Sequence, residues 1–145
     1  MTPLIRRYIK TSFIFLVTGL ALGAYLLVAQ FVFDVYPPRL LVTTHAHLLL
    51  VGFMLMLVMG VATWMFPRPA RDDARYRPEL AEAVYWVMTV ATALRAAAET
   101  LVALAGTLGL RWLIALAGLG QLAGAALFAL NMWRRVRMPP TALPR

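Results

Sequence analysis

Cysteine is absent from this sequence of 145 residues, and charged residues make up only 14% of it. The lack of cysteine excludes a disulfide framework, a thiolate zinc site, an iron–sulfur cluster and the covalent attachment of a haem. A soluble domain carries about 25% charged residues, so water is not the main solvent of this chain. Any cofactor is therefore held noncovalently, by groups inside an apolar structure.

Hydrophobic residues make up 62% of the chain and are concentrated in four long blocks. The blocks cover residues 11–33, 44–66, 83–105 and 112–133. A helix needs about 20 apolar residues to cross about 30 Å of hydrocarbon, and each block is long enough. Short connections force successive helices to run antiparallel. The sequence thus predicts an all-α integral membrane bundle of four helices in up-down-up-down order. We expect one domain over residues 1–145, with a disordered tail over residues 138–145.

The positive charges gather on one side of the predicted membrane. Of the fourteen Lys and Arg residues, eleven lie in the N-terminal segment, the second loop and the tail. They are Arg6, Arg7, Lys10, Arg68, Arg71, Arg75, Arg77, Arg134, Arg135, Arg137 and Arg145. Cytoplasmic segments accumulate such residues, which predicts a bacterial-type inner (cytoplasmic) membrane with both termini cytoplasmic. Topology and lipid head groups explain the net charge of +8, so we expect no nucleic-acid partner. The first block exceeds the apolar core of a signal peptide and is interpreted as a retained helix.

Small residues and methionines indicate how the helices pack. Gly19-x-x-x-Gly23 and Gly120-x-x-x-Gly124 predict faces at which helix backbones approach closely in lipid. A group of methionines in the second block is interpreted as adaptable core filling, with a copper(I) thioether site as the alternative. These methionines are Met54, Met56 and Met59.

Few polar side chains lie inside the predicted spans, and each is costly in hydrocarbon, so each should face the bundle interior with a partner or a task. They are Gln30, His45, His47, Arg95, Glu99, Gln121 and Asn131. Arg95 and Glu99 lie four residues apart on one helix face. One interpretation is an internal ion pair that stabilises the fold. In the other, Arg95 contacts an anionic group such as a haem propionate, and Glu99 hydrogen-bonds a ligating histidine.

His45 and His47 are the only two histidines of the chain, and both lie at the start of the second block. Residues two apart on a helix point about 200° apart, so these two side chains cannot bind one metal ion from a regular helix. One of them can face the bundle while the other faces a neighbouring helix, a second protomer or the membrane interface. The alternative is that both are structural.

Residues 44–53, with the sequence THAHLLLVGF, continue through Gly60 to Pro67. This stretch resembles the second helix of the catalytic subunit (subunit I) of haem-copper oxidases and the related nitric oxide reductases. The family's histidine at this position ligates the low-spin haem, so the resemblance implies that role for His45. His47 matches a His-x-His variant of some members. The chain lacks the family's other histidines and cannot build the binuclear oxygen-reducing centre, so the resemblance does not imply oxidase activity for this chain alone.

These observations predict a small membrane protein related to subunit I that holds a haem b noncovalently. His45 binds the iron, His47 binds the iron or orients the haem, and Arg95 and Glu99 complete the cofactor site. The second axial ligand comes from a histidine of a second copy in a homodimer or other homo-oligomer, or from Met54. Electron transfer, or the binding or sensing of a diatomic gas such as NO or O2, would be its role.

Two other classes of function stay open at this point. One is a cofactor-free accessory subunit of a larger respiratory complex, in which Arg95 and Glu99 form only a buried pair. The other is a copper- or zinc-handling membrane protein that uses His45, His47, Glu99 and the methionines as mixed ligands.

Overall fold

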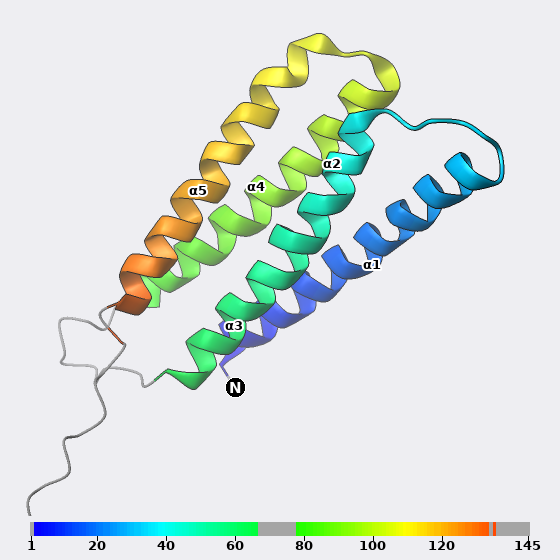
Figure 1. The fold of residues 1–145 in the computed structure, drawn as a ribbon. Coiled ribbons are helices and arrows are strands. Elements are labelled where there is room, and N and C mark those ends of the chain that lie inside the picture. The colour runs from blue at the N-terminus through cyan, green and yellow to red at the C-terminus, as the bar shows by residue number, and fades with distance from the viewer. Residues whose placement is uncertain (1, 67–77, 134, 136–145) are drawn as a thin grey trace, which may run out of the picture.

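The computed structural model describes residues 2–66, 78–133 and 135, and the regular structure within those ranges is entirely helical. The elements in chain order are α1 (Pro3–Phe31), α2 (Arg39–His47), the π-helical segment η1 (Leu48–Leu55), α3 (Met56–Met65), α4 (Pro78–Ala105), the short 3₁₀ turn η2 (Leu108–Leu110) and α5 (Arg111–Trp133). Segments α2, η1 and α3 run on as one long helix (Figure 1). Four helices are therefore long and apolar enough to cross a membrane, which confirms the all-α architecture.

Several helices extend beyond the apolar blocks that predicted them. Helix α1 begins at Pro3 and α4 at Pro78, each well before its apolar block. Proline suits the first turn of a helix because its ring fixes φ near the helical value and no donor is needed there. The apolar blocks mark the part that suits hydrocarbon, whereas the helices continue into polar residues at their ends. The predicted tail over residues 138–145 lies outside the described residues.

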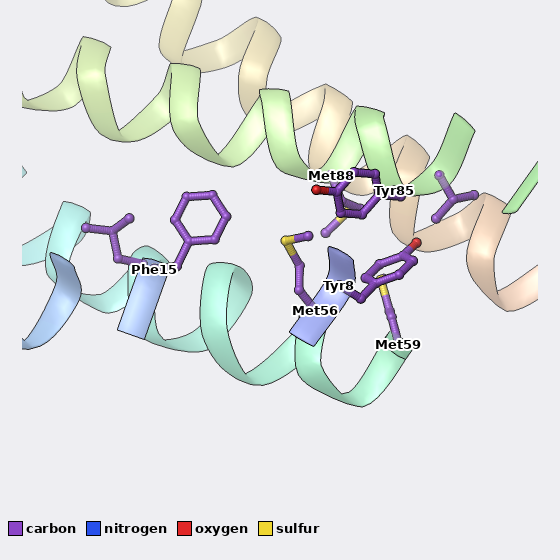
Figure 2. Packing of buried hydrophobic residues seen from close by; sticks show 8 residues of the cluster. Tyr8, Phe15, Met56, Met59, Tyr85 and Met88 are labelled. Atoms are coloured by element: carbon purple, nitrogen blue, oxygen red, sulfur yellow. The ribbon is translucent and has the colours of Figure 1, made fainter. Parts of the chain in front are cut away.

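The helices are arranged with α1 and α5 on opposite sides and the α2–η1–α3 helix and α4 between them (Figure 1). Helix α5 packs along α4, α1 packs along η1 and α3, and α2 packs on α4. Most of the apolar core lies where α1, α3 and α4 meet, and Figure 2 shows it from close by. Its buried residues are Tyr8, Phe15, Leu48, Met56, Met59, Val84, Tyr85 and Met88.

The methionines of the second block do not all behave as predicted. Met56 and Met59 are fully buried in the core, as core filling requires. Met54 is 54% exposed, so the prediction that it fills the core was wrong. It lies two residues before Met56, so its side chain points to the opposite side of the helix from the buried Met56.

At one end of the bundle, polar contacts link the N-terminal parts of α1 and α4. Arg7 and Glu82 form a two-pronged ion pair, with Nη2 of Arg7 3.0 Å from Oε2 of Glu82. The hydroxyls of Thr11 and Tyr85 are hydrogen-bonded at 2.8 Å. The rings of Tyr8 and Tyr85 pack edge to face, with centroids 5.0 Å apart. These contacts fix α1 on α4 at the end that carries the N-terminal basic residues.

Candidate functional site

His45 lies on the side of α2 that faces α1. Its Nδ1 is 2.8 Å from the main-chain oxygen of Gly19. A carbonyl oxygen only accepts, so Nδ1 carries the proton and donates it, and Nε2 keeps its lone pair. A Cβ atom at Gly23 would lie 2.5 Å from Cε1 of His45, so the imidazole fits only because residue 23 has no side chain.

The two predicted glycine faces are both used for close packing. A Cβ atom at Gly19 would lie 2.7 Å from Cδ2 of Leu49, and one at Gly124 would lie 2.7 Å from the sulfur of Met88. The first face therefore brings α1 against α2 and η1, and the second brings α5 against α4. The Gly19-x-x-x-Gly23 face has a second role, because it accepts the His45 ring as well as apolar side chains.

His47 points elsewhere. Its Nδ1 is 2.9 Å from the main-chain oxygen of Thr43, one turn back in the same helix. Nδ1 therefore donates here too, and Nε2 is again left as an acceptor. Two residues along an α-helix turn the side chain by about 200°, so His47 lies on the side of α2 away from α1.

The π-helical segment η1 begins directly after His47 and ends at Leu55. A π-helix bonds each amide one residue further along the chain than an α-helix does, and such segments are frequent at functional sites. Gly52 lies inside it, and a Cβ there would be 2.7 Å from Cγ of Phe15 on α1. The segment separates α2, which carries the two histidines, from α3, where Met56 and Met59 are buried in the core. Helical periodicity alone did not predict it.

Glu99 is fully buried, and both of its carboxylate oxygens are hydrogen-bonded. Oε2 accepts from the hydroxyl of Thr44 at 3.0 Å, and Oε1 accepts from Nε of Arg95 at 2.9 Å. The predicted internal ion pair between Arg95 and Glu99 is therefore present. Because its charge is balanced and both oxygens have partners, the carboxylate avoids most of the cost of an isolated buried charge.

Arg95 extends this network to α5. Its Nη1 donates to Oε1 of Gln121 at 3.0 Å, and Nε2 of Gln121 donates to the hydroxyl of Thr92 at 3.2 Å. Thr44, Glu99, Arg95, Gln121 and Thr92 form one chain of hydrogen bonds that joins α2, α4 and α5. Sequence reasoning missed the two threonines. The spacing of Thr92, Arg95 and Glu99, which puts them on one face of α4, was the available signal.

The hydrogen bonds of the four residues predicted as one cofactor site link them to different partners. Arg95 and Glu99 lie together between α2, α4 and α5, whereas His45 lies against α1 on another face of α2. Glu99 contacts the neighbour of that histidine, Thr44, and not an imidazole. Gln30, in the last turn of α1, is exposed.

The two histidines present their Nε2 atoms on different sides of α2. In the part of the chain that the structure describes, no group of three or more His, Cys, Asp and Glu side chains could hold a metal ion. Each imidazole nevertheless has the protonation pattern of a metal-ligating histidine, because a main-chain carbonyl takes the Nδ1 proton and leaves Nε2 free. A ligand set for one iron therefore requires a further group. Comparison of the chain with protein families, with characterised proteins and with solved structures found no match.

Proposed function

We propose that the chain is a multi-pass protein of a cytoplasmic membrane, in up-down-up-down order and with both termini on the cytoplasmic side. Trp112 and Trp133 are 82% and 83% exposed and lie at the two ends of α5. The helix between them spans about 32 Å, close to the hydrocarbon thickness, and tryptophan favours the two membrane interfaces. Only 17% to 33% of the most apolar window of each long helix is buried, which suits contact with lipid.

Within this membrane bundle, the proposed function is to hold a haem b through Nε2 of His45, as in the oxidase subunit that its second helix resembles. The single observation that carries this proposal is the bond from Nδ1 of His45 to the main-chain oxygen of Gly19. Such a bond fixes the tautomer and the ring orientation of a ligating histidine. When bound, the haem would supply one-electron chemistry of iron or binding of a diatomic gas.

The second axial ligand must come from elsewhere, because Nε2 of His45 and Nε2 of His47 lie on different sides of α2. A two-fold homodimer would present the same histidine twice and supply the pair. Met54, whose side chain is more than half exposed, is the other available group. In this proposal Arg95 and Glu99 hold α2, α4 and α5 together and do not contact the haem. A propionate beside this neutral pair would bring an unbalanced negative charge into apolar surroundings.

A second candidate function is that of a cofactor-free accessory subunit of a larger respiratory complex. The observation that favours it is the hydrogen-bond network around Glu99, in which the carboxylate is satisfied by protein groups alone. In this case the bundle would contribute packing surface only. A copper- or zinc-handling function has no such observation in its favour.

An optical spectrum of the full chain, purified from cells supplied with ample haem, separates the candidates. We expect a Soret band and sharp bands after reduction, and their loss in His45→Ala. A colourless wild-type preparation would overturn the haem function and leave the accessory function standing. His47→Ala is the matched control on the same helix, because full haem in His45→Ala but not in His47→Ala would reverse the ligand assignment. Elemental analysis of the same samples detects copper or zinc.

A further inference from the structure

Helix α1 carries two cations on its outer side, near its N-terminus. Arg6 and Lys10 are exposed, and within the described ranges of the chain neither side chain makes an ion pair. Their neighbour Arg7 lies towards α4 and is bound by Glu82. Arg6 and Lys10 are one turn apart on the helix, and like charges at this spacing repel each other. An anion held between them would remove this repulsion.

The same face of α1 continues as an apolar stripe. Phe13, Ile14 and Val17 follow the two cations at the spacing of residues that share one side of a helix. All three are at least half exposed, whereas the residues that α1 buries, such as Tyr8, point to the opposite side. Helix α1 lies at the edge of the bundle, so this face is its outer one (Figure 1). The outer face of α1 is therefore cationic in its first turns and apolar beyond them.

Trp86 marks the membrane interface on the side of these cations that lies deeper in the bundle. Helices α1 and α4 run parallel, and the ion pair of Arg7 with Glu82 puts those two residues at one level. Trp86 is one turn further along α4, is half exposed and donates its indole N–H to Glu82 at 3.3 Å. Tryptophan favours the membrane interface because its ring is apolar and its N–H is polar. Lys10, three residues after Arg7, is nearly level with this ring.

Trp64 marks the same interface closer to the end of the bundle. Helix α3 runs antiparallel to α1, and a Cβ atom at Gly60 would lie 2.8 Å from Cβ of Tyr8, so these two residues are level. Trp64 is one turn beyond Gly60 and more than half exposed, which puts it slightly beyond the level of Arg6. The levels of the two tryptophans thus enclose both cations. This zone corresponds to the head-group region of a bilayer.

Charge and depth together decide what occupies this face. Two positive charges select an anion, and an arginine guanidinium matches the oxygens of a phosphate with paired N–H groups. A small soluble anion would contact only the cations, whereas a membrane lipid also covers the apolar stripe. A zwitterionic head group brings its own cation, which the two positive charges repel. A phospholipid of net negative charge therefore matches both parts of the face.

We propose that the outer face of α1 is a binding site for one phospholipid of net negative charge. Arg6 and Lys10 hold its phosphate, and an acyl chain lies along the stripe of Phe13, Ile14 and Val17. The site rests on the proposed membrane placement of the chain. It is independent of the proposed haem ligand, which contacts the opposite side of α1.

Native mass spectrometry of the full chain in detergent, titrated with phosphatidylglycerol or with phosphatidylcholine of the same acyl chains, tests this site. We expect the first phosphatidylglycerol to bind about tenfold more tightly than the first phosphatidylcholine. Arg6→Gln and Lys10→Gln should each weaken this binding about fivefold, the effect of one cation at an anionic lipid surface. The double variant should weaken it further.

Arg39→Gln with Arg111→Gln is the matched control, because it removes two exposed cations at the other end of the bundle. Binding of the first phosphatidylglycerol should be unchanged in it. sn-Glycerol 3-phosphate carries the same phosphate without acyl chains, so at the same concentrations it should not displace the lipid.

The site would be overturned if the variant with both Arg6→Gln and Lys10→Gln bound phosphatidylglycerol as wild type does. An equal loss in the control variant would also overturn it, because the preference would then follow net charge alone. Displacement by sn-glycerol 3-phosphate would assign the cations to a soluble phosphate ligand instead. A changed oligomeric state in cross-linking, without any lipid preference, would assign the face to another protein chain. The two single variants decide the test if the double variant fails to insert.

The failure of this site and the failure of the proposed function give different results. Variants at Arg6 and Lys10 should keep the Soret band of wild type, so loss of lipid preference leaves the haem proposal standing. Release of the wild-type chain from membranes by alkaline carbonate would overturn the membrane placement itself. A chain that stays in the membrane but shows no preference for phosphatidylglycerol would overturn only the lipid site.

Discussion

The hydroxyl of Thr44 donates to the buried carboxylate of Glu99 at 3.0 Å, and this bond joins α2 to α4. Threonine hydroxyls in helices usually bond back to a carbonyl of the preceding turn, and that of Thr44 also lies 2.8 Å from the oxygen of Leu40. The single hydroxyl proton is therefore shared between the carbonyl of Leu40 and the carboxylate of Glu99. The neighbouring residue, His45, is thereby directed to the opposite partner, α1.

Replacing Thr44 by valine should destabilise the bundle by about 1–3 kcal/mol, because one oxygen of Glu99 would then be buried without a donor. Valine keeps the shape of threonine, so packing changes little. Thr43→Val is the matched control, since that hydroxyl donates only to Arg39 of its own helix. Unfolding by sodium dodecyl sulfate titration measures both variants. Equal losses for the two would show that the Glu99 contact contributes nothing.

Glu99→Gln should cost about 3–5 kcal/mol, because it leaves the Arg95 charge without its partner inside the bundle. Arg95→Leu should cost a similar amount for the opposite reason. Removing both charges, as Arg95→Leu with Glu99→Leu, should cost clearly less than the two single changes added together. The same unfolding titration gives the coupling. Strict additivity of the two changes would mean that the ion pair is not energetically coupled.

The ion pair between Arg7 and Glu82 should behave differently. Both side chains are about two-fifths exposed, so water and salt screen the pair. Arg7→Gln should therefore cost about 1 kcal/mol or less, and most of that loss should disappear in 1 M salt. Thermal unfolding at low and high salt checks this. A loss that salt does not reduce would point instead to the contact between the Arg7 guanidinium and the Tyr85 ring, whose centroid lies 5.6 Å from the guanidinium carbon.

The helices and their glycine faces could be predicted because these features are local in sequence. An apolar block long enough to cross a bilayer specifies a helix, and a small-residue face specifies close packing. The ion pair of Arg95 and Glu99 was likewise accessible, since four residues make one turn. Which helix lies against which face is a tertiary property. That is why the packing of His45 against Gly23 and the hydrogen bond from Arg95 to Gln121 could not be predicted.

The π-helical segment η1 is the main local feature that the sequence did not predict. It follows His47 and shifts the helical phase of the residues after it. Apolar residues fill every position of the segment, so no periodic pattern marks the change. The predicted site residues also contact different helices, for a tertiary reason. Adjacent residues Thr44 and His45 contact different neighbouring helices.

Gly23→Ala should displace the imidazole of His45. The added Cβ would lie 2.5 Å from Cε1 and 2.9 Å from Nδ1, and the ring cannot move away from α1 without lengthening its bond to Gly19. Alanine is otherwise favourable in a helix, by about 1 kcal/mol over glycine, so simple propensity predicts stabilisation. We expect the opposite sign, a destabilisation, together with loss of haem if His45 is its ligand.

Gly109→Ala serves as the control for this change, because a Cβ there lies in open space. The unfolding titration and the Soret absorbance are read on the same samples. The double variant Gly23→Ala with His45→Ala separates the two effects, since removing the ring removes the clash and should restore the stability lost in Gly23→Ala. A stable Gly23→Ala protein with full haem would mean that the His45 ring does not rest on Gly23 in the membrane. If the double variant regains stability but not haem, then His45 has both of its assigned roles, the contact with α1 and the ligation of iron.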